Sequence, residues 1–150
     1  VIPYMMGKLK LSAKQMDEVL NKKSGLLGIS GESSDSRDIE DGINKGNERC
    51  ILAQKMYVRR IVDYIAKYYV ELGGCDAIVF TAGVGENSVS VRRQVMEELK
   101  VFGIELDEEK NNIRGSIQKI STSESSVKVY VIPTDEELMI ARDTLELINN

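Results

Sequence analysis

Apolar residues recur at helical spacing in several stretches of the chain, and polar or glycine-rich segments separate these stretches. The first predicted helix begins after Ser12, which forms a capping box with Gln15, and it ends before Gly25. Small and polar residues dominate residues 28–38, so this segment is predicted to be a loop. The apolar face of the first helix consists of Met16, Val19 and Leu20.

A long helix is predicted from about Asn47 to Leu72, and Gly73-Gly74 is placed to end it. Residues 76–81 then form a short, continuous apolar run, which is typical of a strand buried on both faces. A glycine-containing connection leads into a further helix that begins near Ser88. The predicted apolar stripe of the long helix is Ala53, Tyr57, Ile61, Ile65 and Leu72, and the inward positions of the second are Val91, Val95 and Leu99.

The last third of the chain predicts a strand and a final helix after a polar excursion. Residues 107–126 are polar and predict a surface segment with one short element. Residues 127–132 predict a strand that Pro133 ends, and Thr134 with Glu137 forms a second capping box. The order of helices, buried strands and turns predicts an α/β fold in one domain or a large part of one. The expected buried face of the final helix is Leu138, Ala141, Leu145 and Ile148.

The composition excludes several classes of function and of catalytic site. The net charge of −4 argues against a general nucleic-acid binder, and the chain contains no histidine, which excludes a Ser-His-Asp triad or an imidazole zinc site within it. No apolar run reaches the ~20 residues of a membrane span and no signal peptide is visible, so we expect a cytoplasmic protein without a membrane partner. Cys50 and Cys75 are then expected to be reduced thiols. The chain begins at Val1 rather than Met, and we expect a longer gene product.

The connection Gly83-Val84-Gly85-Glu86-Asn87 is suited to a phosphate ligand. Glycines allow a sharp turn and close approach, and a following helix N-terminus offers N–H groups to an anion. The connection also follows the carboxyl end of a predicted strand, where ligands gather in open α/β sheets. The alternative is an ordinary strand-to-helix connection, and the pattern alone does not decide between the two because a short Gly-x-Gly is weak evidence.

Two further segments carry suitable side chains. In residues 28–38, Ser33 to Asp35 offer hydroxyl and carboxylate groups and Arg37 offers a planar guanidinium, although such polar loops are more often simple connections. In residues 133–137, a carboxylate could reach Mg²⁺ together with substrate phosphates. Acidic residues in a first helical turn usually serve only the helix dipole, and the pattern alone favours that role.

Four segments together resemble one family over essentially all 150 residues. Residues 80–88, FTAGVGENS, resemble the FTAGIGENS signature of acetate kinases, and residues 21–31, NKKSGLLGISG, are similar to a second segment of that family. Residues 33–38, SSDSRD, match its SSDxRD continuation, and residues 132–138, IPTDEEL, resemble its IPTNEEL ending.

This resemblance implies that residues 1–150 are the C-terminal, nucleotide-binding portion of a larger kinase. The implied fold is α/β, part of an actin-like, sugar-kinase and Hsp70 ATPase (ribonuclease H-like) domain, with a mixed sheet flanked by helices. The implied reaction is reversible transfer of the ATP γ-phosphoryl group to acetate, giving acetyl phosphate and ADP, with Mg²⁺ required. The family also implies a homodimer.

By motif match, the resemblance assigns nucleotide contacts to Asp35, Ser36 and Arg37 and to the run Gly83, Val84, Gly85, Glu86 and Asn87. It assigns the carboxylate tied to Mg²⁺ to Glu136. Ser36 stands where Phe is common in the family, and Asp135 stands where Asn is common. No catalytic residue is assigned within this chain, because the family's first phosphate loop and acyl pocket lie in its N-terminal half, so we expect no turnover from the chain alone.

Two alternatives stay open at this point. A propionate kinase shares the same ATP motifs, and the residues that separate it from an acetate kinase line the acyl pocket outside this chain. A non-catalytic nucleotide-binding module would also carry these segments.

Overall fold

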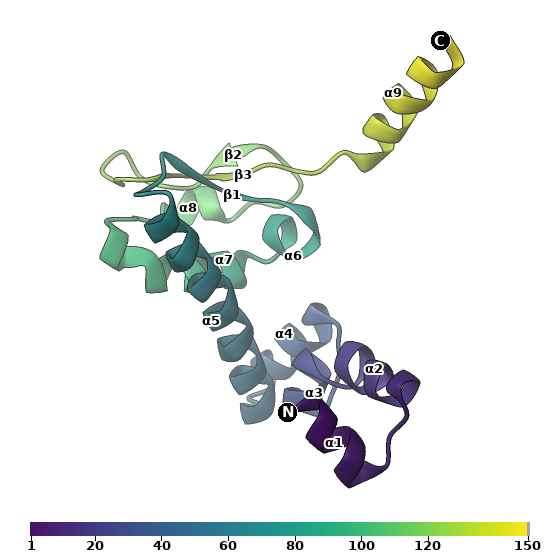
Figure 1. Ribbon diagram of the computed structural model, residues 1–150. Coiled ribbons are helices and arrows are strands. Elements are labelled where there is room, and N and C mark those ends of the chain that lie inside the picture. Colours follow the sequence, from purple (N-terminus) through teal and green to yellow (C-terminus); the bar gives the residue numbers. More distant parts are fainter. Residues whose placement is uncertain (150) are drawn as a thin grey trace. The chain divides into compact units, whose positions relative to one another are not determined.

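The computed structural model describes residues 1–149, and their contacts group them into two compact units, one of residues 1–64 and one that begins at Ile65 (Figure 1). The boundary falls inside a continuous helix, α5 (Glu48–Glu71). No change in composition marks the boundary, because it lies in the middle of a regular element.

The first unit is helical. Its capping box is confirmed: the Ser12 hydroxyl oxygen accepts the N–H of Gln15 at 3.3 Å, and Gln15 Oε1 accepts the N–H of Ser12 at 2.9 Å. Met16 is buried as predicted, but Leu20 is exposed. Ahead of α5 the unit consists of α1 (Ile2–Leu9), α2 (Ala13–Lys22), α3 (Gly25–Ser30) and α4 (Ser36–Asn44).

The predicted loop at residues 28–38 is mostly helical. Gly25 follows the end of α2, as predicted, but it also starts α3, and Ser36 starts α4, so only residues 31–35 are irregular. The prediction failed because the small polar residues that favour turns also cap helices. Here the Asp35 carboxylate accepts the N–H of Arg37 and caps α4.

Helix α5 has about the predicted length, but of the predicted stripe only Ala53 is buried. It ends at Gly73 and Gly74, whose φ angles of 71° and 118° suit glycine. The predicted residue Leu72 is exposed. The buried stripe lies one residue away from the predicted one and includes small side chains because α4 packs closely: a Cβ on Gly42 would lie 2.5 Å from the Cys50 sulfur. It consists of Cys50, Ala53, Gln54, Val58 and Val62.

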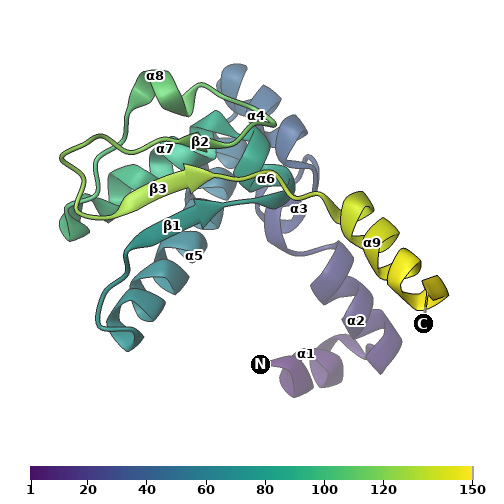
Figure 2. The same cartoon turned by 90° about the horizontal axis from the view of Figure 1, so that it is seen from above.

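The second unit contains a small mixed sheet, which confirms the predicted fold class. The strand order is β1-β3-β2, with β1 parallel and β2 antiparallel to β3 (Figure 2). Its elements are β1 (Ala77–Phe80), α6 (Ala82–Asn87), α7 (Val89–Glu98), the 3₁₀-helix η1 (Leu99–Phe102), α8 (Glu108–Asn111), β2 (Gln118–Lys119), β3 (Lys128–Val131) and α9 (Glu136–Asn149).

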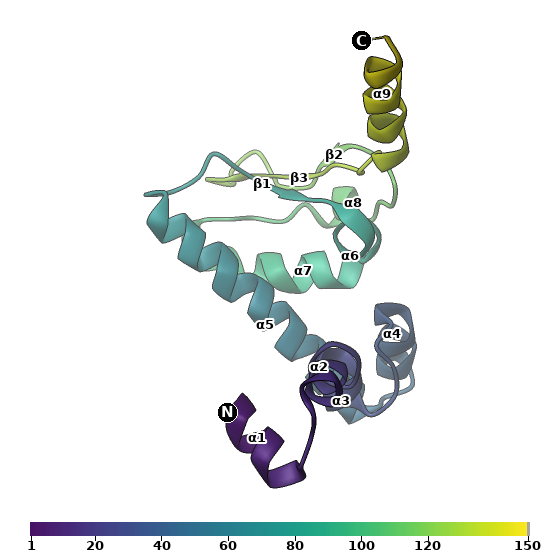
Figure 3. The same cartoon turned by 45° about the vertical axis from the view of Figure 1, so that its right-hand side comes forward.

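Helix α7 covers one face of this sheet (Figure 3). Phe80, Val129 and Val131 on that face are buried, and so are the predicted inward residues of the helix region, Val91, Val95 and Leu99. On the opposite face Val79 is 47% exposed. The expectation that this strand is buried on both faces is therefore wrong for this unit. Among its described residues, no helix covers the second face of the sheet (Figures 1 and 3).

The polar segment of residues 107–126 belongs partly to the core. It contains α8 and β2, and Asn111, Ile120 and Ser121 are almost completely buried. The Ser121 hydroxyl oxygen accepts the N–H of Val129 at 3.0 Å. A polar composition did not indicate this burial, because the buried polar groups are hydrogen-bonded.

Helix α9 forms where predicted, but none of its residues is buried. Of the expected inward positions, Leu138 is 43% and Ile148 is 75% exposed. Helical periodicity correctly predicts an apolar face, but it does not show whether the described chain supplies a surface to cover that face.

The two cysteines are free thiols in different surroundings. Cys50 is completely buried in the first unit. Cys75 is half-buried in the connection between α5 and β1. Partial burial and the adjacent Asp76 carboxylate raise the pKa of the Cys75 thiol.

Candidate functional site

The segment from Gly83 to Asn87 follows the carboxyl end of β1 and leads into α7. It is a short helix, α6, and not the glycine turn that the sequence predicts. The Asn87 side chain donates from Nδ2 to the carbonyl oxygen of Gly83 at 2.9 Å, which holds the single turn together. Helix α7 then begins next to Ser88, as predicted, and the Ser88 hydroxyl oxygen caps it by accepting the N–H of Val91.

The unusual backbone angle of this segment lies at Ala82 and not at the glycines. Ala82 has φ of 56°, in the left-handed region that residues other than glycine rarely adopt, whereas Gly83 and Gly85 have no such angle. A Cβ on Gly83 would meet no atom within 4 Å, and one on Gly85 would lie 3.4 Å from the Phe80 backbone. Neither a left-handed angle nor close packing therefore requires glycine at these two positions, and the sharp-turn role predicted for the two glycines is wrong.

Thr134 joins this segment to the neighbouring strand. Its hydroxyl oxygen accepts the N–H of Ala82 at 3.2 Å and lies 2.7 Å from the hydroxyl of Thr81. Its own N–H donates to Glu86 Oε1 at 2.7 Å. Because β1 and β3 are parallel neighbours, the two predicted segments meet at one edge of the sheet.

Sequence reasoning misses Thr81 and assigns Thr134 the wrong role. The N-cap of α9 is Asp135, whose Oδ1 accepts the N–H of Leu138 at 2.9 Å, because the Thr134 hydroxyl is engaged at α6. The roles of both threonines follow from the parallel pairing of β1 with β3. The sequence of either strand alone does not reveal this pairing. Glu136 lies exposed in the first turn of α9, immediately after this edge.

The acidic side chains present could hold a magnesium ion only if a bound nucleotide supplied further oxygen ligands. Among residues 1–149, no group of three or more Cys, Asp or Glu side chains gathers to hold a metal. Magnesium usually keeps several waters and binds through one or two carboxylates plus substrate phosphates. The exposed carboxylate of Glu136 is suited to that mode, in which the nucleotide brings the remaining oxygen ligands.

In the first unit, Asp35 and Arg37 form a close pair. Arg37 donates from Nη2 to Asp35 Oδ2 at 2.6 Å and from its backbone N–H to Oδ1 at 2.9 Å. These hydrogen bonds from Arg37 lower the pKa of Asp35 to about 2, and the carboxylate raises the pKa of Arg37. Ser36 between them is the first residue of α4 and is half-buried.

Asp35 occupies only one edge of the guanidinium. The Arg37 side chain is 86% exposed, and no residue of the described chain accepts a hydrogen bond from its Nη1. The pair therefore presents a fixed, solvent-facing cation that could receive a phosphate or stack on a base.

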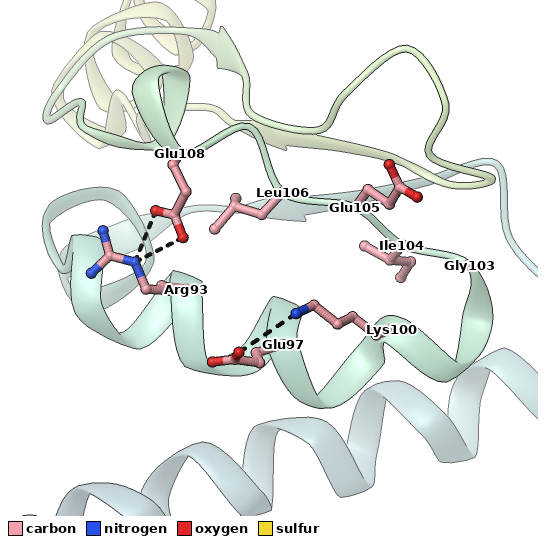
Figure 4. Close-up of a pocket in the computed structure, with 8 residues that line it drawn as sticks. All are labelled: Arg93, Glu97, Lys100, Gly103, Ile104, Glu105, Leu106 and Glu108. Carbon is pink, nitrogen blue, oxygen red and sulfur yellow. Dashed lines mark hydrogen bonds and ion pairs between the residues drawn. The ribbon is translucent and has the colours of Figure 1, made fainter.

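Each unit also contains a cavity that is lined by none of the residues assigned to the nucleotide or to Mg²⁺, although Ser33 lies in the wall of the one in the first unit. The cavity of about 520 Å³ in the second unit is lined by charges that pair with one another: Arg93 with Glu108 at 2.8 Å and Lys100 with Glu97 at 3.5 Å (Figure 4). A cavity of about 330 Å³ in the first unit is mainly acidic, with Glu32, Asp38 and Asp41 in its wall.

The predicted site residues thus fall into two groups. The structure brings Glu86 of the α6 segment against Thr134, two residues before Glu136, in the second unit. Asp35, Ser36 and Arg37 belong to the first unit. In residues 1–149, no helix is both long and apolar enough to cross a membrane.

Comparison with known proteins gives one consistent result. The model of the acetokinase family matches residues 1–142. Acetate kinase of Treponema denticola is 53% identical over 99% of this chain, and acetate kinase of Halothermothrix orenii is 49% identical over all of it. The chain spans only 37% and 38% of the length of these two relatives.

Solved structures agree with the sequence comparison. Porphyromonas gingivalis acetate kinase matches 98% of this chain with a TM-score of 0.90 and 47% identity, and the chain covers 37% of that protein. A propionate kinase from Francisella tularensis matches 93% of the chain with a TM-score of 0.84 and 35% identity, and 35% of its length is covered. The α/β architecture is therefore part of the actin-like ATPase fold of acetate kinases, and the chain belongs to the acetokinase family.

Proposed function

We propose that this chain is the C-terminal, nucleotide-binding portion of an enzyme that transfers the γ-phosphoryl group of ATP reversibly to acetate, giving acetyl phosphate and ADP. The observation that carries the proposal is the acetokinase match over residues 1–142, together with identities near 50% to acetate kinases across the whole chain. Phosphoryl transfer depends mainly on positioning and charge neutralisation. The role of this chain is to position the nucleotide.

In the second unit, the backbone of Gly83 to Asn87 contacts the nucleotide. The position of this segment at the carboxyl end of β1 supports the assignment, since ligands collect at such ends in α/β sheets. The Thr134 hydroxyl oxygen accepts the N–H of Ala82, and the Thr134 N–H donates to the Glu86 carboxylate, so both bonds hold the segment in place. Such preorganisation lowers the conformational cost of binding.

In the first unit, Asp35, Ser36 and Arg37 contact the nucleotide. The Asp35 carboxylate orients the guanidinium of Arg37, and the exposed Nη1 edge is suited to a phosphate oxygen or a base. Ser36 adds a hydroxyl at the start of α4. The common Phe at this position of the family would instead add an apolar ring.

Glu136 contributes one carboxylate toward Mg²⁺ in the nucleotide complex. When it is bound, the ion neutralises charge on the phosphates. Asp135, next to it, is engaged as the cap of α9 through Oδ1. Its negative charge adds to the local attraction for a cation.

Propionate is the second candidate acceptor. The likeness to the propionate kinase structure, at 35% identity, supports keeping it. Curated acetate kinases reach 45% to 53% identity, which favours acetate, although one acetate kinase structure shares the same 35% as the propionate kinase. We also propose a homodimer in the cytoplasm, on the family resemblance.

The test is an acetyl phosphate assay on the full-length protein with Mg-ATP, in which hydroxylamine traps the product. We expect turnover with acetate and a lower kcat/KM with propionate. An equal-concentration sample of residues 1–150 should give no product, since the chain spans 37% of its relatives' length. A full-length protein that is stabilised by Mg-ADP against heat but forms no acyl phosphate would instead support a non-catalytic nucleotide-binding module.

A further inference from the structure

Arg92, in α7, is completely buried, and no carboxylate of residues 1–149 pairs with it. Each N–H of its guanidinium donates to a neutral oxygen. Nε donates to Asn111 Oδ1 at 2.9 Å, and Nη2 donates to the carbonyl oxygens of Asn111 and Ile113, both at 2.8 Å. Nη1 donates to the carbonyl oxygens of Gly85 and Glu86 at 2.9 and 2.8 Å.

Burial of this charge is costly, because no negative group compensates the lost hydration. Burial and the nearby charge of Arg114 accordingly lower the pKa of Arg92. All the N–H groups of this buried cation donate to backbone and amide oxygens. We take this as a sign that the guanidinium serves to hold those backbone segments in place. Two of those oxygens belong to α6.

Helix α6 needs external support because it is only 6 residues long. A helix of one to two turns is unstable alone, and its last carbonyl groups lack partners within the helix. Arg92 supplies partners for two of these carbonyls, while Thr134 holds the opposite end through the N–H of Ala82. The segment is therefore fixed at both ends by side chains from outside it.

We propose that Arg92 is a positioning residue for the nucleotide: it anchors the carbonyls of Gly85 and Glu86 and so holds α6 in its binding conformation before the ligand arrives. This inference rests on the proposed function, in which α6 contacts the nucleotide. Arg92 itself does not touch the nucleotide, since its guanidinium is buried and fully occupied.

Lysine cannot replace this arginine in the proposed role. An ammonium group has three donors at one point, whereas the planar guanidinium reaches oxygens on several sides. Arg92→Lys therefore keeps the charge but loses bonds to α6 or to residues 111–113. We expect Arg92→Lys in the full-length protein to raise the KM for ATP about tenfold or more, with the KM for acetate within about twofold of wild type.

Two control variants separate positioning from general damage. Arg93→Lys changes the adjacent arginine, which is exposed and paired with Glu108 on the surface, and should leave both KM values unchanged. Val95→Ala removes buried side-chain volume from the same helix without a hydrogen bond to α6, so it should lower the melting temperature and leave the KM for ATP unchanged. If Val95→Ala raises the KM for ATP as much as Arg92→Lys does at similar stability, the positioning role is refuted.

A measurement on the wild-type protein tests the inference even if the Arg92 variants do not fold. The backbone N–H of Ser88 donates to the carbonyl oxygen of Val84 at 2.9 Å at the end of α6. We expect this amide and those of Glu86 and Asn87 to exchange with deuterium at least ~100-fold more slowly than in an unfolded chain before nucleotide is added. Exchange at unfolded-chain rates that slows only with Mg-ADP would overturn the inference.

These outcomes are separable from the proposed function. A wild-type protein that neither binds nucleotide nor phosphorylates acetate contradicts the function, and with it the positioning role. An active wild-type protein whose Arg92→Lys variant folds and keeps its KM for ATP contradicts the role of Arg92 alone.

Discussion

Ala82 takes a backbone conformation that its side chain opposes. The left-handed φ of 56° costs an L-residue about 1–2 kcal/mol, and the hydrogen bond from the Ala82 N–H to Thr134 helps to maintain it. The two glycines that follow it do not have left-handed angles. Backbone strain of this kind often lies at functional positions, and here it lies at the start of the segment proposed to hold the nucleotide.

Ala82→Gly should therefore stabilise the protein by up to about 1 kcal/mol, because glycine adopts this angle without strain. Ala66→Gly is a matched control in α5, where glycine should destabilise by roughly 0.5–1 kcal/mol through lost helix propensity. Urea denaturation of both variants measures the two effects. Equal destabilisation by both would show that the left-handed angle at position 82 is not strained.

Asp35 is the titratable group with the clearest shift. Arg37 lowers its pKa from 3.8 to about 2, so the native state keeps this carboxylate charged where the unfolded chain protonates it. Because the folded pKa is lower than the unfolded one, the contribution to stability is complete above pH 4 and is lost as the pH falls through about 2.

We expect an NMR titration of the Asp35 side-chain carbon to show a midpoint near 2 in the wild-type protein. Arg37→Gln should move this midpoint up toward 3.8, because both the ion pair and the side-chain hydrogen bond are lost. Asp107, whose lowered pKa arises from Lys110, should titrate unchanged in the same variant. An Asp35 midpoint that does not respond to Arg37→Gln would contradict the pairing.

At the scale of elements, most local start and stop signals were reliable, whereas tertiary contacts were not predicted. The capping box at Ser12, the glycines after α5 and the start of α7 near Ser88 were predicted correctly, because each depends on residues within one turn of the chain. The cap predicted at Thr134 was wrong, because the pairing of β1 with β3 brings its hydroxyl to Ala82, and the stripe that α5 buries depends on its packing against α4. The periodicity of apolar residues within one element reveals neither the contact of α5 with α4 nor the pairing of β1 with β3.

Helix α9 must be stabilised by interactions within the helix and at its ends, because it buries no residue. None of its residues is buried, so packing contributes little, and isolated helices of this length are marginal in water. The cap at Asp135 and the acidic side chains of Glu136 and Glu137 in the first turn are its main local support.

Asp135→Ala in the chain of residues 1–150 should lower the helix content of α9 by removing a cap worth about 1 kcal/mol. Asp135→Asn should largely preserve it, since the amide oxygen still accepts the N–H of Leu138. NMR chemical shifts and amide exchange across residues 137–149 measure the effect. The unfolding midpoint of the sheet should stay the same, and a large fall in that midpoint would show that α9 packs on the unit.

At the scale of the whole molecule, the predicted site residues form two groups, and each group belongs to a different unit. Asp35 to Arg37 lie in the first, and α6 with Glu136 lies in the second. The motifs could be predicted from the sequence because each is a short run of residues with a family counterpart. The supporting groups could not be predicted, because Arg92 is a charged residue of a helix, and its sequence neighbours do not indicate that it is buried.

The contrast between the two thiols provides a way to label residues 1–150 and to follow nucleotide binding to them. Cys50 is completely buried, whereas Cys75 is only half-buried, so within these residues a maleimide dye should attach at Cys75, in the turn before β1. The raised pKa of Cys75 keeps its thiolate scarce at neutral pH, and labelling should accelerate as the pH is raised toward 9. Residues 1–150 thus offer a natural attachment point for a fluorescent reporter close to the strand that leads into the proposed nucleotide segment.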